Sequence, residues 1–335
     1  MYNDNSVFKY NIPNLEWTIP CQFQYEPVFG AIQSSLMELG FEPIKANTFG
    51  APATIWSGGR KPSIYGELSN KELEKRFEYL TSFNGIPTFT FTCTCVEEEH
   101  IQDKYANRII DVAKDFNARY IVFSDALKDH IRKKVPGAQI VSSVVKAICH
   151  FQGVTRKENP TPENESRYYN EMLKEYDVVV VRPEYSKTVL TTTPEMIDDL
   201  SRIEVMINQM CFSSCPNAPL HSRTLEKQRV KPGRMPEFIC PKHRLPLCQQ
   251  YKTNSSHTYE DVVKILNAGV RNLKLQGRGE DVPYLSTLIG LSSQIMRFDG
   301  PNNILIKKVL PEKLNIELEH FDNMINQIRK EQGRV

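Results

Sequence analysis

Short runs of apolar and β-branched residues alternate along the chain with longer segments whose apolar residues recur every three or four positions. The first pattern is typical of buried strands and the second of amphipathic helices, so the alternation predicts βα units around a parallel sheet. The predicted strands are Phe8–Pro13, Phe41–Thr48, Ile86–Cys93, Tyr120–Ser124, Gln139–Val145, Asp177–Arg182, Ile203–Asn208 and Asn272–Gln276.

Helical periodicity fills the intervals between these strands. Predicted helices cover about 25–39, 70–84, 99–116, 126–134, 164–176, 194–201 and 258–268. The sequence "SNKE" from Ser69 to Glu72 is a capping box and predicts a helix start. Eight strands joined by seven crossovers fit a (β/α)8 TIM barrel spanning residues 1–300. An open doubly wound sheet is the alternative, but no G-x-G-x-x-G turn follows the first predicted strand.

Residues 209–257, after the seventh predicted strand, are rich in Pro, Cys, His and basic residues and poor in aliphatic ones. A loop of this length inside a domain is usually functional or ordered by a ligand. In a barrel it lies at the carboxyl end of the strands, where barrel active sites are built. We therefore expect the site at this insertion.

The tail at 301–335 contains one apolar stripe at helical spacing. It consists of Leu314, Leu318, Phe321, Ile325 and Ile328. The stripe predicts a helix packed on the flank of the barrel, which we favour over a contact between two copies of the chain.

Composition narrows the classes of partner. The chain has 42 Lys and Arg against 40 Asp and Glu, so it carries no bulk positive field for binding nucleic acid. No stretch approaches the roughly 20 apolar residues of a membrane span, and the amino-terminal segment lacks a secretory signal pattern. We expect a cytoplasmic protein with reduced thiols.

Four of the eight cysteines, Cys211, Cys215, Cys240 and Cys248, fall within 38 residues of the polar insertion. Four thiolates can close the tetrahedral shell of zinc or hold a 4Fe-4S cluster. His243 lies between the last two, which suits a mixed zinc site, but the C-x2-C pairs of structural zinc are absent. Spacing alone therefore leaves iron–sulfur and zinc open.

Cations at predicted strand ends form a second candidate set. Arg182, Lys274 and Arg278 end or follow strands and suit an anionic substrate, although ion pairs with nearby carboxylates account for them equally well. His221, six residues after Cys215, is a candidate proton donor or a partner of the metal ligands.

The order "INQMC", "SSCP", a histidine, a later cysteine and then "AGVRNLKLQGR" resembles the collagenase-like peptidase family U-32. The resemblance is to its branch of anaerobic ubiquinone-hydroxylation iron–sulfur proteins, and "LKLQGR" resembles that family's Lys-x-x-Gly-Arg segment. It implies a barrel-like fold and a 4Fe-4S cluster on Cys211, Cys215, Cys240 and Cys248. Some relatives draw one ligand from an earlier strand end, so Cys93, Cys95 or Cys21 is the alternative to Cys248.

The resemblance also implies an activity. Characterised relatives carry out oxygen-independent hydroxylation of ubiquinone precursors or RNA bases, with prephenate implicated as the oxygen source. We therefore expect an enzyme that modifies a small-molecule or nucleoside substrate. The alternatives are a metal-stabilised accessory subunit with a protein partner and a zinc-dependent hydrolase or peptidase, although neither H-E-x-x-H nor G-x-S-x-G occurs in the chain.

Overall fold

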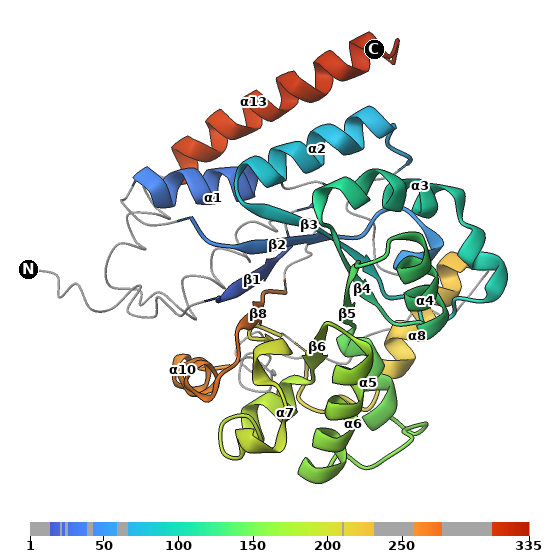
Figure 1. The fold of residues 1–335 in the computed structure, drawn as a ribbon, viewed down its shortest axis with the longest axis vertical. Coiled ribbons are helices and arrows are strands. Elements are labelled where there is room, and N and C mark those ends of the chain that lie inside the picture. The colour runs from blue at the N-terminus through green and yellow to red at the C-terminus, as the bar shows by residue number, and fades with distance from the viewer. Residues whose placement is uncertain are drawn as a thin grey trace, which may run out of the picture.

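The computed structural model describes residues 14–20, 22–23, 26–38, 43–58, 66–209, 211–230, 257–276 and 310–334. Its centre is a closed barrel of eight parallel strands in the order β1 to β8, with helices outside (Figure 1). The strands are β1 Glu16–Ile19, β2 Ala46–Gly50, β3 Gly85–Phe91, β4 Arg119–Val122, β5 Gln139–Ser142, β6 Val178–Val181, β7 Ile203–Met206 and β8 Asn272–Lys274. The predicted (β/α)8 fold is confirmed.

The helices that follow the strands form the outer layer of the barrel. They are α1 Glu26–Glu38, α2 Asn70–Ser82, α3 Lys104–Ala113, α4 Asp125–Lys134, α5 Val144–Phe151, α6 Pro162–Glu175, α7 Pro183–Thr188, α8 Ala218–Val230, α10 Tyr259–Ala268 and α13 Leu310–Glu331. Both halves of the capping box predicted at Ser69 and Glu72 are formed at the start of α2. No described helix has the length and apolarity needed to cross a membrane.

Alternation along the strands divides the core in two. On the outer face of the strands, Trp17 and Ile19 of β1 and the outward-facing apolar side chains of the other strands pack against the helices in the larger hydrophobic cluster. Apolar side chains on the opposite face of the strands, including Phe49, Ile121 and Val141, belong to a smaller cluster inside the barrel. The barrel interior therefore has its own apolar layer, above which a ligand can be held.

Charged side chains also lie inside the barrel, and each has a partner. Glu16 of β1 binds Arg119 of β4 at 2.7 Å and also pairs with Lys45. Burial raises the pKa of the Glu16 carboxyl, but the two cations outweigh it and hold the pKa below its usual value. Pairing of this kind is what allows charge in a barrel core.

Three predicted elements need correction, and the first predicted strand is not tested by the structure. The barrel begins at β1, Glu16–Ile19, whereas the predicted strand Phe8–Pro13 lies outside the described residues. The predicted strand end at Val144 and Val145 is instead the start of α5, capped by the Ser143 hydroxyl. Residues 194–201, predicted as a helix, instead contain 3-10 turns at Pro194–Met196 and from Leu200, the second of which ends at Arg202, and the helix that follows β6 is α7. The insertion at 209–257, read as a loop, contains α8.

The C-terminal helix α13 lies across α1 and α2 on the outside of the barrel (Figure 1). Phe321, Ile325 and Ile328 are buried, and the ring of Phe321 packs 5.2 Å from that of Tyr79 in α2. The predicted flank packing is confirmed, except that Leu318 is exposed. Arg329 and Arg334 reach back to the buried carboxylate of Glu72, so the tail is tied to the start of α2.

Candidate functional site at the carboxyl end of the barrel

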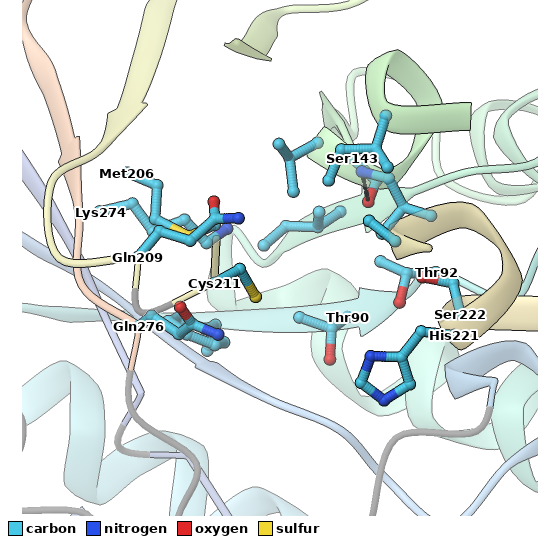
Figure 2. Close-up of a pocket in the computed structure, with 16 residues that line it drawn as sticks. Thr90, Thr92, Ser143, Met206, Gln209, Cys211, His221, Ser222, Lys274 and Gln276 are labelled. Carbon is cyan, nitrogen blue, oxygen red and sulfur yellow. Dashed lines mark hydrogen bonds between the residues drawn. The ribbon is translucent and has the colours of Figure 1, made fainter. Parts of the chain in front are cut away.

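A cavity of about 190 Å3 lies at the carboxyl ends of the strands, between the barrel interior, α5 and α8 (Figure 2). Its wall joins apolar side chains to a smaller set of polar ones. The lining residues are Phe49, Thr90, Thr92, Ile121, Ser143, Val144, Val145, Ile148, Met206, Gln209, Cys211, Ala218, His221, Ser222, Lys274 and Gln276. Apolar walls with a few converging polar groups are the usual make-up of a small-molecule site.

Lys274, at the end of β8, supplies the cation of this cavity. It is buried, and its Nζ lies 3.1 Å from Oε1 of Glu204 on β7 and 4.9 Å from the centre of the Phe49 ring. Glu204 also accepts a 2.6 Å hydrogen bond from the Thr18 hydroxyl. The buried ammonium thus lies between a carboxylate that is held from β1 and an aromatic face.

Cys211 lies in the cavity wall directly after β7, with the Gln209 and Gln276 side chains on one side and Thr90 on the other (Figure 2). The loop that carries it is fixed at two points. The Ser214 N–H donates to the Glu184 carboxylate of α7, with Ser214 in the left-handed region at φ 51°. The Cys215 carbonyl then accepts from the Ala218 N–H at the start of α8. These two hydrogen bonds thereby fix the segment that carries Cys211 and Cys215, of which Cys211 lines the cavity.

His221 reaches the same cavity from the first turn of α8, where its N–H donates to the Asn217 carbonyl. Helix α8 packs on α5, and this packing brings the His221 ring to the wall opposite Lys274. Cys211, His221 and Lys274, three of the residues predicted from the sequence, therefore share one cavity. The arrangement brings a thiol, an imidazole and an ammonium group to the wall of one cavity.

Arg182 does not line this cavity. Its guanidinium is bound by the Glu165 carboxylate of α6 through two hydrogen bonds of 2.9 and 3.0 Å, and its side chain is 2% exposed. The backbone N–H of Arg182 donates to the Tyr169 hydroxyl at 3.0 Å. The structure thus gives Arg182 an internal ion pair that ties the end of β6 to α6.

The remaining predicted ligands divide into two groups. Cys240, Cys248, Arg278 and Cys21 lie outside the described residues. Cys93 and Cys95 follow β3; Cys93 is fully buried, and neither lines the cavity, although Thr92 beside Cys93 does. Among the cysteines that the structure describes, none forms a disulfide.

Sequence reasoning missed the polar side chains that complete the wall. Thr90 and Thr92 alternate along the end of β3, and their signal was the "TFTFT" pattern that places every second residue inside the barrel. Asn208, the last residue of the seventh predicted strand, forms two hydrogen bonds with the backbone of Gln276, at 2.8 and 2.6 Å. It therefore joins the ends of β7 and β8.

One group of three metal-type donors within 4.8 Å of one another occurs in the part of the chain that the structure describes. It consists of Glu97, Glu99 and His100, after β3. Both carboxylates are exposed, and Nδ1 of His100 accepts the Glu97 N–H. Local capping explains this cluster, so we assign no site to it.

Comparison of the chain with protein-family models finds no match, and comparison with curated proteins finds none either.

Proposed function

We propose that this protein is an iron–sulfur enzyme that carries out a redox modification of a small molecule in the cavity at the carboxyl end of the barrel. The observation that carries the proposal is the meeting of Cys211, His221 and Lys274 in that cavity. The cysteine block that resembles family U-32 begins at this point of the chain, so a metal group bound there borders the substrate.

The donor set fits a metal–sulfur group as far as it is described. Cys211 is exposed and Cys215 is half-buried, neither forms a disulfide, and both are carried by the short segment between β7 and α8. Cys240 and Cys248 complete the four thiolates in the proposal. A 4Fe-4S cluster on these residues supplies electron transfer or a Lewis-acidic iron.

The side chains of the cavity supply binding and proton transfer. Lys274 places positive charge at its inner end, where it attracts an anionic or carbonyl oxygen of the substrate. His221 holds or releases a proton at one of its ring nitrogens, and the amides of Gln209 and Gln276 orient polar groups. Phe49, Ile121 and the other apolar residues exclude water around the bound molecule.

Size limits the substrate. A volume of about 190 Å3 is below the roughly 300–1,000 Å3 typical of sites for drug-sized ligands. The cavity therefore suits a compact substrate with one anionic or carbonyl group for Lys274 and an apolar part for the barrel side.

The test is anaerobic purification followed by a visible absorption spectrum and assays of iron, acid-labile sulfide and zinc. We expect a brown protein with about four irons and four sulfides per chain. Cys211→Ala and Cys215→Ala should each bleach it, whereas Cys149→Ala, a buried cysteine of α5 outside the cysteine block, should not. A colourless chain with one zinc and no sulfide, or full colour in Cys211→Ala, would refute the proposal.

A further inference from the structure

A second cavity, of about 440 Å3, lies beside the first and shares no lining residue with it. It is formed by the segments after β3 and β4 together with α5, α6 and α8. The lining residues are Thr94, Val96, Phe123, Ser124, Asp125, Lys146, Cys149, His150, Thr155, Lys157, Tyr168 and Arg223. Helices α5 and α8 thus contribute to both cavities, with different residues.

The charges of this cavity are predominantly positive. Lys146 comes from α5, Lys157 from the segment after it and Arg223 from α8, whereas Asp125 is the one carboxylate in the lining. Three positive charges less one negative charge leave a formal charge of +2. Cations from three separate segments around one hollow are suited to one anion that contacts all of them.

Lys146 and Asp125 form the ordered part of the cation cluster. The Lys146 ammonium donates to Asp125 at 2.7 Å and to the Phe123 carbonyl at 3.1 Å, and the Tyr176 hydroxyl donates to the same carboxylate oxygen at 2.7 Å. Burial lowers the pKa of Lys146, and the Asp125 carboxylate opposes that effect. Asp125 is thereby engaged from two sides, and Lys146 is fixed in direction.

Two uncharged side chains, Tyr168 and His150, lie among these cations. The ring of Tyr168 packs 4.5 Å from that of His150, and burial raises the pKa of the Tyr168 phenol, so it keeps its proton and can donate. The His150 ring lies 3.5 Å from Glu158, a carboxylate that also pairs with Arg167 outside the lining. Burial lowers the pKa of His150, and the one N–H of the neutral ring, at Nε2, is directed to the Glu158 carboxylate.

We propose that this second cavity binds a phosphate-bearing small molecule, a phosphomonoester held by Lys146, Lys157 and Arg223. A phosphomonoester carries about −1.5 to −2 at neutral pH, which matches the formal +2, whereas a single carboxylate leaves one cation uncompensated. Arginine binds phosphate oxygens in a two-pronged fashion and lysine as a point charge, so this set of cations suits such a group. The volume exceeds that of a phosphate alone and leaves room for a polar organic part.

Binding there has a consequence for the first cavity. Arg223 follows His221 and Ser222, which line the first cavity from the same helix, and α8 begins three residues after Cys215. A phosphate that joins Arg223 to Lys146 of α5 and to Lys157 therefore fixes α8 against α5. The second ligand would order the helix that carries His221.

The experiment is isothermal titration calorimetry of the full chain with ribose 5-phosphate, with ribose, inorganic phosphate and malonate as separate titrants. We expect one site per chain for ribose 5-phosphate, weaker binding of inorganic phosphate and none of ribose. Lys157→Gln and Arg223→Gln are both exposed positions and should each weaken binding about tenfold or more, since each removes a charge-assisted hydrogen bond. Lys174→Gln, an exposed lysine of α6 outside the cavity, should bind as the unchanged chain does.

Amide hydrogen exchange of residues 218–230 is the second readout. Ribose 5-phosphate should slow exchange in α8 of the unchanged chain and leave it unaffected in Arg223→Gln. The proposal is overturned by the absence of one-site binding at millimolar ribose 5-phosphate, by equal affinity for malonate, or by unchanged affinity in both variants. None of these outcomes depends on the metal content of the chain, so the two proposals can fail separately.

Discussion

His257, two residues before the start of α10, is a buried imidazole whose protonation should control acid stability. Its side chain is 2% exposed, and its Nε2 lies 2.7 Å from the Ser186 hydroxyl of α7. Because that hydroxyl donates to the Pro183 carbonyl, it accepts from Nε2–H of the ring. Within the part of the chain that the structure describes, Nδ1 has no hydrogen-bond partner, so a second proton there would be buried without an acceptor.

Burial, assisted by the charge of Lys187, lowers the pKa of His257 from 6.5 to about 4. The unfolded chain therefore binds a proton in the range from pH 6.5 to pH 4 that the folded chain does not. The stability from this group is complete above pH 6.5 and is lost as the pH falls through 4. At about 1.4 kcal/mol for each pH unit, the loss amounts to about 3 kcal/mol at pH 4.

The perturbation is His257→Gln, because a glutamine amide can donate to Ser186 yet does not titrate. The assay is urea unfolding at pH values from 7.5 to 4, with the free-energy difference between the two chains as the readout, so that carboxylates common to both cancel. We expect the unchanged chain to lose about 3 kcal/mol relative to the variant across this range. Ser186→Ala, which removes the hydrogen bond and keeps the ring, should retain the acid loss. A difference that stays constant from pH 7.5 to 4 would refute the reasoning.

Three further predictions concern stability. Arg182→Met leaves Glu165 buried without its cation and should lower the free energy of unfolding by about 3–5 kcal/mol, whereas Arg182→Met combined with Glu165→Leu should recover most of the loss in urea titrations. Phe321→Ala should lower the free energy of unfolding by about 3–5 kcal/mol, because it removes the ring of α13 that packs on Tyr79. A loss below about 1 kcal/mol would contradict that packing. Ser69→Ala removes the cap of α2 and should lower the unfolding free energy by about 1 kcal/mol, measured by thermal melts.

The barrel was predictable because its signals are local and repeated. Four consecutive valines form β6, and the capping box that starts α2 needs only four adjacent residues. The start of α5 was wrong because Val144 and Val145 continue the β-branched pattern of β5 without a break, although Ser143 before them is a cap signal. The helix α8 was missed because its sequence lacks a clear apolar face.

The site was predictable only in so far as topology brings strand ends together. Lys274 and Cys211 follow adjacent strands of the barrel, so their shared cavity follows from strand order alone. Arg182 also ends a strand, yet its partner is Glu165, 17 residues earlier on the helix that covers it. The position of an arginine in the sequence does not distinguish one that binds a ligand from one that pairs with a carboxylate of the neighbouring helix. Either partner neutralises the guanidinium charge.

The docking of α13 also orders events during synthesis. Phe321 of α13 covers the face of α2 that contains Tyr79. During synthesis, Tyr79 leaves the ribosome about 240 residues before Phe321 does. At a translation rate of roughly 5–20 residues per second, this face of α2 stays uncovered for on the order of 10–50 seconds. During this interval the nascent chain presents Tyr79 and Phe83 to water and to chaperones. Helix α13 thus covers the first quarter of the barrel only after all eight strands have been translated.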